Sequence, residues 1–311
     1  MNPNVSIILP YYEGFPWLQR AVQSVRRQTH EAWELLIVDD GSRHGPERIV
    51  AKFHDDRIRL LRIPHAGKGA ALNAGVENAR SEAVCFLDQD DIMLPQRLER
   101  QLGALDRSPL INGVYSDYER RYDSGEFIDR FTSRQAAPGE VLHSLATGRS
   151  LFTMQTLMVR KPFVEKAGGF SEDPRLVGLD DVEFFVRLIL SDPLLVYTPG
   201  LVQCWVLHGQ NFSRSDDFQK ARLWWLKRLS ELAEDHPLLR AEMPRFGFHS
   251  RYMRGIYFLE NCLPEHAVAE FQKALVFRPV RLNAYYLLLK SVAWCAAKRW
   301  GIAASRLKTR S

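Results

Sequence analysis

Short apolar runs alternate with helix-like segments along the first part of the chain. The runs lie at residues 5–10, 35–38, 58–61 and 83–87, and each has the length of a buried strand. Between them apolar residues recur every three or four positions, as at residues 17–25, which is typical of amphipathic helices. This alternation predicts βαβ units and a mostly parallel, doubly wound α/β sheet with helices on both faces.

Acidic residues directly follow two of these runs. Asp39 and Asp40 end the second run, and Asp88, Asp90 and Asp91 follow the fourth. Ligands of doubly wound sheets bind at the carboxyl ends of the strands, so we expect these five acids to gather along one edge. An Asp-x-Asp pair at a strand end suits Mg²⁺ or Mn²⁺, which combines a few carboxylates with substrate phosphates. The alternative interpretation is that Asp90 or Asp91 caps the next helix.

At this point the chain resembles a known family. VSIILPYYEG, VDDGS, GKGAALNAG and FLDQDD occur in the order found in the inverting family 2 glycosyltransferases of GT-A fold. Residues 159–170 are similar to the acceptor-side segment of that family, residues 178–188 to its acidic catalytic motif, and residues 208–213 to its late His-to-Ser motif. The resemblance covers about residues 3–215, and its specificity comes from the order of the motifs, since each is weak alone.

The resemblance implies a nucleotide-diphosphate-sugar as donor and Mn²⁺ or Mg²⁺ as cofactor. The cation would act as a Lewis acid for the departing nucleoside diphosphate. Lys68, at a glycine-flanked helix start, would meet the diphosphate, although it could instead be a solvated loop lysine. The implied donor-binding residues are Pro10, Tyr11, Glu13, Asp39, Asp40, Lys68, Asn73, Asp88 and Gln89, and the implied metal ligands are Asp88, Asp90, Asp91 and His208.

A second acidic pair matches the position of the catalytic base in this family. The alignment places Asp181 at the base position, and Asp180 stands where the family usually has glutamate. A carboxylate within about 3 Å of the acceptor hydroxyl can take its proton. The alternative is that both acids only open the helix at residues 182–190, where the helix dipole favours them.

Two further residues leave their roles open. His208 follows an apolar run, so it is either a metal or phosphate contact or a packed, hydrogen-bonded histidine. The family commonly has Pro–Thr–Tyr–Asn at the end of the first strand, where this chain has Pro10–Tyr11–Tyr12–Glu13. Tyr11 could still stack on the base, but Glu13 adds a negative charge near an anionic donor. The nucleobase and sugar therefore stay undefined.

The last third of the chain predicts helices. Residues 217–232 have the spacing of one long helix, with Trp224, Trp225 and Leu229 as packing residues. At residues 248–281 the pattern resembles a single tetratricopeptide-like hairpin, which would pack on the catalytic domain or on another copy in a homo-oligomer. The residues that carry this pattern are Gly255, Phe258, Ala267, Phe271, Ala274 and Pro279.

Composition agrees with a globular enzyme. The 311 residues are 46% hydrophobic and 25% charged, and the four cysteines are scattered, as expected of reduced thiols in the cytoplasm. No secretory leader is predicted. Five cations in the last 21 residues equal the net charge of +5, and no nucleic-acid-binding motif accompanies them. This basic tail either lies on an anionic membrane surface or is a solvated terminus.

These observations predict a GT-A catalytic domain at residues 1–215 and a helical region at residues 216–311. Within the catalytic domain, residues 1–118 form the nucleotide-sugar half and residues 119–215 the acceptor and base half. The leading hypothesis is a metal-dependent inverting transferase that moves a sugar to a glycan or lipid-linked acceptor in cell-surface polysaccharide synthesis. The alternatives are a nucleotidyltransferase with a similar sheet and a non-catalytic binding or scaffold protein that acts through its helices.

Overall fold

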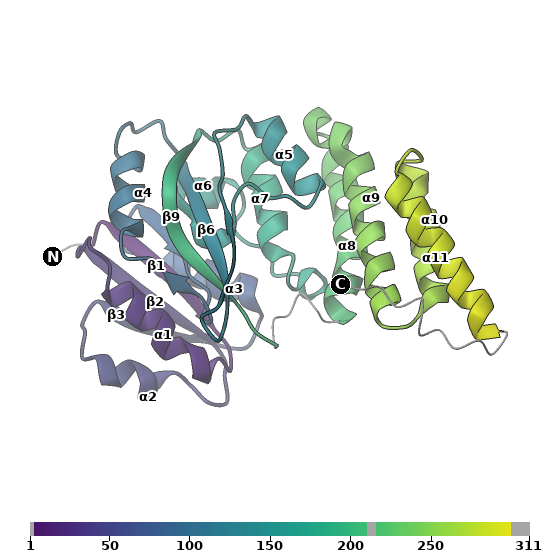
Figure 1. Ribbon diagram of the computed structural model, residues 1–311. Helices are drawn as coiled ribbons and strands as arrows, with labels where there is room; N and C mark the ends of the chain where they lie inside the picture. The colour runs from purple at the N-terminus through teal and green to yellow at the C-terminus, as the bar shows by residue number, and fades with distance from the viewer. Residues whose placement is uncertain (1–2, 210–215, 300–311) are drawn as a thin grey trace. The chain divides into compact units, whose positions relative to one another are not determined.

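The computed structural model of the protein describes residues 3–209 and 216–299, and these form two compact units. The first unit comprises residues 3–141 with 151–209, and the second comprises residues 142–150 with 216–299. In Figure 1 the sheet of the first unit is drawn in purple to teal and the long helices of the second in green to yellow. The basic tail predicted from the sequence lies beyond the described residues, apart from the end of the last helix.

The first unit is built on a nine-stranded sheet with the order β3-β2-β1-β4-β8-β6-β9-β5, and β7 pairs with β6. Strands β3, β2, β1 and β4 run parallel, whereas β8 pairs antiparallel with both β4 and β6. The predicted α/β fold is therefore confirmed, and the sheet becomes mixed beyond β4. The strands are β1 Val5–Tyr11, β2 Trp33–Asp40, β3 Ile58–Ile63, β4 Ala83–Phe86, β5 Ile92–Met93, β6 Gly113–Tyr122, β7 Phe127–Phe131, β8 Leu157–Arg160 and β9 Leu195–Leu207.

Helices pack on this sheet through apolar stripes. In α1 the residues Leu18, Ala21, Val22 and Val25 are fully buried, which is the three-to-four spacing of a helix face. They join the strands in one hydrophobic cluster. The remaining bounds are α1 Phe15–Arg26, α2 Glu47–Val50, α3 Lys68–Asn78, α4 Arg97–Leu105, α5 Pro138–Ala146, α6 Lys161–Lys166 and α7 Asp180–Leu190, with 3₁₀ turns at Ala51–Phe53, Met154–Thr156 and Pro174–Leu176.

Helix α3 lies unusually close to the sheet because of one glycine. A Cβ atom at Gly75 would come within 2.4 Å of Ile8 Cγ2 on β1, so any larger residue would push the helix outward. This close packing fixes the start of α3 near the carboxyl ends of β1 and β2, where Lys68 begins the helix.

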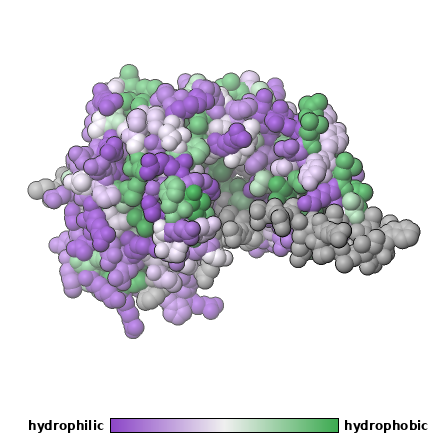
Figure 2. All heavy atoms as spheres, in the orientation of Figure 1, coloured by the Kyte–Doolittle hydropathy of each residue, from purple (hydrophilic) through white to green (hydrophobic). Residues whose placement is uncertain are grey.

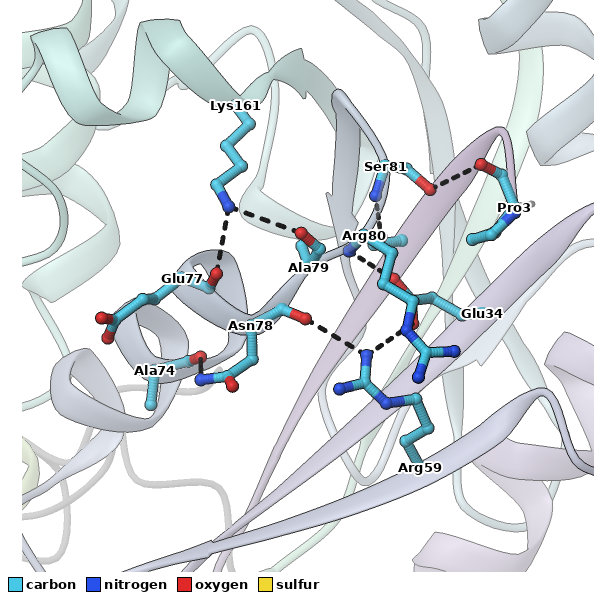
Figure 3. Close-up of polar contacts among 11 residues, drawn as sticks. Pro3, Glu34, Arg59, Ala74, Glu77, Asn78, Ala79, Arg80, Ser81 and Lys161 are labelled. Atoms are coloured by element: carbon cyan, nitrogen blue, oxygen red, sulfur yellow. Dashed lines mark hydrogen bonds and ion pairs between the residues drawn. The ribbon is translucent and has the colours of Figure 1, made fainter.

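The opposite edge of the sheet is held by a buried acid. Glu34, near the start of β2, accepts hydrogen bonds from Ser6 Oγ at 2.6 Å, Arg80 N at 2.7 Å and Arg59 at 2.7 Å. Figure 3 shows how Arg59 also reaches the carbonyl of Asn78 at the end of α3. Burial alone would raise the pKa of Glu34, but these hydrogen bonds outweigh it and hold the pKa below its ordinary value.

The second unit contains the long helices α8 Asp216–Ala233, α9 Pro237–Glu260, α10 Pro264–Phe277 and α11 Leu282–Arg299. Its helical character was predicted and is confirmed. A Cβ atom at Gly255 of α9 would meet the ring of Phe271 at 2.5 Å, so these two positions let α9 and α10 pack closely. Trp225 and Leu229 are buried as predicted. Within the described residues, none of the helices combines the length and hydropathy that crossing a bilayer requires.

The buried acid at the amino edge of the sheet gives a test of stability. We expect Glu34→Gln to lower the free energy of unfolding by roughly 1–3 kcal/mol at neutral pH, because Arg59 and Arg80 N lose a charged acceptor. The folded-state pKa of Glu34 is lowered, so its stabilisation is present above the unfolded pKa of about 4.3 and is lost as the pH falls through the folded value.

Calorimetric unfolding of the two proteins should therefore differ at neutral pH and converge in strong acid. The exposed Glu82, which pairs with Arg160, provides the matched control, Glu82→Gln, and should change little. A difference between Glu34→Gln and the parent protein that did not shrink in acid would contradict this role for the carboxylate.

Candidate active site

Carboxylates from two segments of the first unit lie around Lys68, at the start of α3. Lys68 Nζ is 2.7 Å from Asp88 Oδ1, just beyond the end of β4. The other oxygen of Asp88 accepts a short hydrogen bond from Gln155 Nε2 in the turn Met154–Thr156. Burial would lower the pKa of Lys68, but the negative charges of Asp88, Asp180 and Asp181 raise it above its ordinary value. One ammonium group thus interacts with acids from two separate segments of the chain.

Asp180 and Asp181 occupy the first turn of α7. Burial raises the pKa of Asp181 to about 7, and the adjacent charge of Asp180 adds to this effect. Asp181 Oδ1 accepts a hydrogen bond from Val182 N at 2.7 Å, which holds the carboxylate at the helix start. Asp180 is 6% exposed, and its Oδ2 is buried without a hydrogen-bond partner. A carboxylate with a pKa near neutrality can serve as a base, and an orphaned buried oxygen can accept a proton donor from a ligand.

Asp90 lies beside a histidine that follows strand β9. His208, after β9, places Nε2 at 2.9 Å from Asp90 Oδ2. The imidazole ring is stacked on Trp17 of α1, with ring centroids 4.3 Å apart and an interplanar angle of 18°. Burial and then the charge of Asp88 raise the pKa of Asp90, although the hydrogen bond from His208 opposes the shift. Trp17 therefore sets the orientation of the histidine that contacts this acid.

Asp91 points into the protein. It is 3% exposed, and its Oδ1 accepts a hydrogen bond from Val206 N of β9 at 2.9 Å. Burial and the charge of Asp90 raise its pKa well above the ordinary value. The structure thus gives Asp91 a contact that joins the acidic loop to β9, and its role as a metal ligand stays a prediction.

A buried arginine holds the strand ends next to the acidic loop. Arg97 of α4 is fully buried and donates hydrogen bonds to the carbonyl of Phe86 at 3.1 Å, to that of Leu157 at 3.3 Å and to the side chains of Gln101 and Gln203. It connects the ends of β4 and β8 with β9, and burial lowers its pKa. This residue fixes the strand ends from which the acids project.

The two acids at the end of β2 differ in their surroundings. Asp40 accepts hydrogen bonds from Ala66 N at 2.7 Å and Gly67 N at 3.0 Å, so it holds the loop that leads into Lys68. Asp39 accepts one from Ser42 N, and its buried Oδ2, which has no hydrogen-bond partner, forms an ion pair with Arg62 Nε at 3.5 Å. Asp39 therefore keeps an oxygen that accepts no hydrogen bond, whereas both oxygens of Asp40 accept backbone hydrogen bonds.

Tyrosines 11 and 12 at the end of β1 face opposite ways. Tyr11 is 1% exposed, donates a hydrogen bond to the carbonyl of His44, and has a pKa raised to about 12 by burial and by the charges of Glu13 and other acids. Tyr12 is 47% exposed, and its ring is stacked on His65 with centroids 4.5 Å apart. Tyr12 is therefore the exposed ring here, and it was not among the residues predicted from the sequence.

Three of the predicted donor-binding residues position backbone segments. Gln89 exchanges two hydrogen bonds with the backbone of Tyr12, accepting from its N at 3.0 Å and donating to its O at 3.2 Å. Glu13 accepts from Arg43 N and contacts His44 Nδ1 at 3.1 Å, so its charge faces the next loop. Pro10 is buried in β1 opposite Val38.

Asn73 of α3 fastens the segment that precedes the acidic helix. Its Nδ2 donates to the carbonyl of Phe170 at 2.9 Å and to Glu172 Oε1 at 2.8 Å, and its Oδ1 accepts from Phe170 N at 2.7 Å. A Cβ atom at Gly169, where φ is +66°, would lie 2.8 Å from Asn73 Oδ1. The Gly168–Gly169 pair noted in the sequence thus allows this close approach, and direct contact of Asn73 with a donor stays a prediction.

The acids fit an open cation site better than a closed cage. Within residues 3–209 and 216–299, no three His, Cys, Asp or Glu side chains converge on one point that could hold a metal ion. Mg²⁺ usually takes one or two carboxylates and completes its shell with waters and substrate phosphates. Asp88 and Asp90 provide two hard oxygen ligands whose charges interact. A divalent cation with a diphosphate suits this donor set.

Trp17, Tyr12 and Gln155 contact the predicted site but were not predicted as site residues. Alternation along β1 could not have identified Tyr12, because both faces of this strand are buried and Tyr12 follows its last residue. Trp17 was assigned only to a helix face, and Gln155 lies in a region that showed no recognisable chemistry. The contacts of Gln155 with Asp88 and of Trp17 with His208 join residues that are at least 67 positions apart, so no local pattern could reveal them.

Comparison with known proteins finds a family match within the sheet-bearing unit. Residues 6–155 match the family model for glycosyl transferase family 2. The chain is 36% identical over 132 residues to WfgD of Escherichia coli, a UDP-Glc:alpha-D-GlcNAc-diphosphoundecaprenol beta-1,3-glucosyltransferase; the match covers 42% of this chain and 51% of WfgD. It is 30% identical over 162 residues to TuaG of Bacillus subtilis, a putative teichuronic acid biosynthesis glycosyltransferase, with coverages of 51% and 62%.

Solved structures show the same fold. TarS 1-349 of S. aureus has a TM-score of 0.63 at 16% identity and covers 97% of this chain and 92% of its own. The mannosyltransferase PcManGT of Pyrobaculum calidifontis, in complex with GDP-Man and Mn²⁺, has a TM-score of 0.59 at 20% identity, with coverages of 96% and 82%. This chain spans only 41% and 43% of the length of its glycosyltransferase relatives from Rickettsia felis and Rickettsia conorii.

The acidic pair of α7 predicts a stability that depends on pH. We expect Asp181→Asn to raise the melting temperature by roughly 3 °C or more at about pH 8, because a buried charge beside Asp180 is removed. The folded-state pKa of Asp181 is raised to about 7, so the parent protein loses stability as the pH rises from the unfolded value toward 7.

Thermal unfolding of both proteins across this range would check the sign. The gain should vanish near pH 4, where the carboxyl group is protonated in the folded state. The matched control is Asp192→Asn at the exposed end of α7, which should give no pH-dependent difference. A constant offset between Asp181→Asn and the parent protein would contradict the proposed burial of charge.

Proposed function

From the family 2 glycosyltransferase domain that this chain carries over residues 6–155, we propose that the protein transfers a sugar from a nucleotide-diphosphate-sugar to a hydroxyl group with inversion at the anomeric carbon. The observation that carries the proposal is the position of Lys68, whose ammonium group lies at Asp88 and interacts with Asp180 and Asp181. This arrangement groups Asp88, which we assign to the donor side, with Asp180 and Asp181, which we assign to the acceptor side, around the ammonium group of Lys68.

On the donor side, Asp39 Oδ2, which is buried, accepts no hydrogen bond and is ion-paired with Arg62 Nε, would accept an N–H or O–H of the nucleoside. Lys68, in the first turn of α3, would exchange its carboxylate partner for the diphosphate, which the helix N-terminus also favours. Asp40 and Gln89 keep the neighbouring loops in place. We assign this donor half to residues 1–118.

A cation belongs to this proposal. Asp88 and Asp90 would hold Mn²⁺ or Mg²⁺, His208 would complete or orient that set, and Asp91 would hold the loop to β9. When bound, the cation would stabilise the negative charge that develops on the departing diphosphate. The Mn²⁺ in the structure of PcManGT supports this assignment.

On the acceptor side, Asp181 is the proposed base. The acceptor oxygen forms a bond to the anomeric carbon, the bond to the nucleoside diphosphate breaks, and the hydroxyl proton passes to Asp181. A base with a pKa of about 7 is deprotonated in half of the molecules at neutral pH and still attracts a proton effectively. Asp180 raises this pKa, so we assign it a supporting role in the acceptor half at residues 119–215.

The acceptor is proposed to be a glycan or lipid-linked sugar used in cell-surface polysaccharide synthesis. WfgD acts, by its name, on a diphosphoundecaprenol-linked sugar, and TuaG is assigned to teichuronic acid biosynthesis. We therefore place the protein at the cytoplasmic face of the membrane, where such acceptors would be reached.

The most direct test of this function is turnover. Sugar nucleotides of the UDP, GDP and dTDP series should be offered with Mn²⁺, and release of nucleoside diphosphate measured. We expect one donor to be hydrolysed slowly without an acceptor and faster with one. A protein that binds a sugar nucleotide but never releases the diphosphate would be a binding protein, and release of sugar 1-phosphate with transfer of the nucleotidyl group would indicate a nucleotidyltransferase.

The base has a specific kinetic signature. Because Asp181 acts when deprotonated, the turnover rate should rise about tenfold per pH unit below its pKa of about 7 and level off above it. Asp181→Asn should lower transfer by several orders of magnitude and abolish this slope while donor affinity stays nearly unchanged. An equal loss of transfer and donor binding would remove Asp181 from the base role.

The metal assignment predicts different effects for substitutions of two adjacent acids, Asp90 and Asp91. Asp90→Asn should weaken Mn²⁺-dependent stabilisation by UDP, GDP or dTDP by at least about tenfold in apparent affinity, because a hard anionic ligand is lost. Asp91→Asn should instead lower the melting temperature with or without metal, since its contact is to Val206 N. Identical behaviour of both variants in the thermal-shift titration would contradict this division of roles.

A further inference from the structure

The last helix of the second unit has an apolar outer face. Along α11, Leu282 is 81% exposed, Tyr286 65%, Leu289 68% and Val292 47%. Their spacing of four, three and three residues places them on one side of the helix. We call these four residues the outer face of α11. Figure 2 shows apolar surface among the side chains of the second unit.

The opposite side of α11 already packs in the helical core. Ala284 and Ser291 are fully buried, and Trp294 is 7% exposed in a cluster with Leu259 and Phe271. A helix on a protein surface normally has one apolar stripe and a polar outer side. Since the inward stripe is satisfied, the apolar residues of the outer face require a different explanation.

The charge of this region indicates the kind of surface that it meets. Residues 271–311 contain nine Lys and Arg residues and no Asp or Glu, whereas the whole chain carries +5, so residues 1–270 carry −4. The last three of these cations lie outside the described residues. The nine are Lys273, Arg278, Arg281, Lys290, Lys298, Arg299, Arg306, Lys308 and Arg310.

We propose that the outer face of α11 docks on the surface of an anionic lipid bilayer, with the helix lying in the plane of the interface. Leu282, Leu289 and Val292 would enter the boundary between headgroups and acyl chains, and Tyr286 would sit at the headgroup level. Arg281, just before Leu282, and Lys290, between Leu289 and Val292, would meet lipid phosphates. No described helix can span the bilayer, so the contact is peripheral.

A second copy of the chain is a weaker candidate for this face. A symmetric contact through α11 would bring together two copies of residues 281–299, each of which contains four cations and no acid. Their repulsion opposes association, whereas an anionic bilayer attracts the same charges. The proposal extends the lipid-linked acceptor of the proposed function, because docking through α11 would bring the enzyme to the surface that holds such acceptors.

Vesicle co-sedimentation of the full-length protein tests the docking without any turnover. The parent protein should bind mixed phosphatidylglycerol–phosphatidylcholine vesicles and bind pure phosphatidylcholine much less. Leu282→Ser with Leu289→Ser should lower the partition coefficient on mixed vesicles by at least about tenfold. Arg281→Gln with Lys290→Gln should lower it about tenfold as well, and should have no effect on pure phosphatidylcholine.

The matched control is Leu238→Ser on α9, where the leucine is 59% exposed but outside the outer face of α11. It should bind like the parent protein, and circular dichroism should show that all variants keep their helices. Equal binding of the α11 variants and the parent protein would overturn the proposal. So would an absence of vesicle binding together with a dimer, seen by sedimentation velocity, that Leu289→Ser dissociates. Donor hydrolysis is measured separately, so failure of docking would leave the proposed transferase activity standing.

Discussion

The shared counter-charge of Lys68 is the interaction on which the candidate site depends. Asp88, Asp180 and Asp181 come from two distant segments, and without a cation their charges would repel one another. The ammonium group holds them together and remains close to the place proposed for an anionic diphosphate. The same charge that assembles the acids is therefore available to a donor, and binding of the donor would change the electrostatic environment of the proposed base.

The surrounding protein keeps this arrangement in place with hydrogen bonds to the backbone and one buried cation. Asp40 holds the loop before α3, Gln89 holds the end of β1, and Arg97 binds the carbonyl groups at the ends of β4 and β8. These groups can hold the segments of the site in place without contacting a substrate. Several residues expected to bind the donor are thus engaged in positioning, which leaves the direct contacts to fewer side chains, notably Asp39, whose buried Oδ2 accepts no hydrogen bond.

Much of the fold could be predicted from the sequence, because the apolar runs of β1, β2 and β4 and the helical spacing of α1 and α8 are local patterns. The acids at the strand ends could also be placed on one edge, since topology alone requires it. The antiparallel strands beyond β4 could not be predicted, because their pairing depends on contacts between distant segments. For the same reason the stacking of Trp17 on His208 and the bond from Gln155 to Asp88 had no signal in the sequence.

Helix α3 works as a spacer of fixed length within the first unit. Lys68 in its first turn contacts Asp88, and Asn73, about 7.5 Å further along the axis, grips the backbone of Phe170 before the acidic helix. One residue inserted between these positions would rotate one contact by about 100° relative to the other. The five-residue interval between Lys68 and Asn73 therefore has to stay constant, whereas the loops on either side of α3 can change in length.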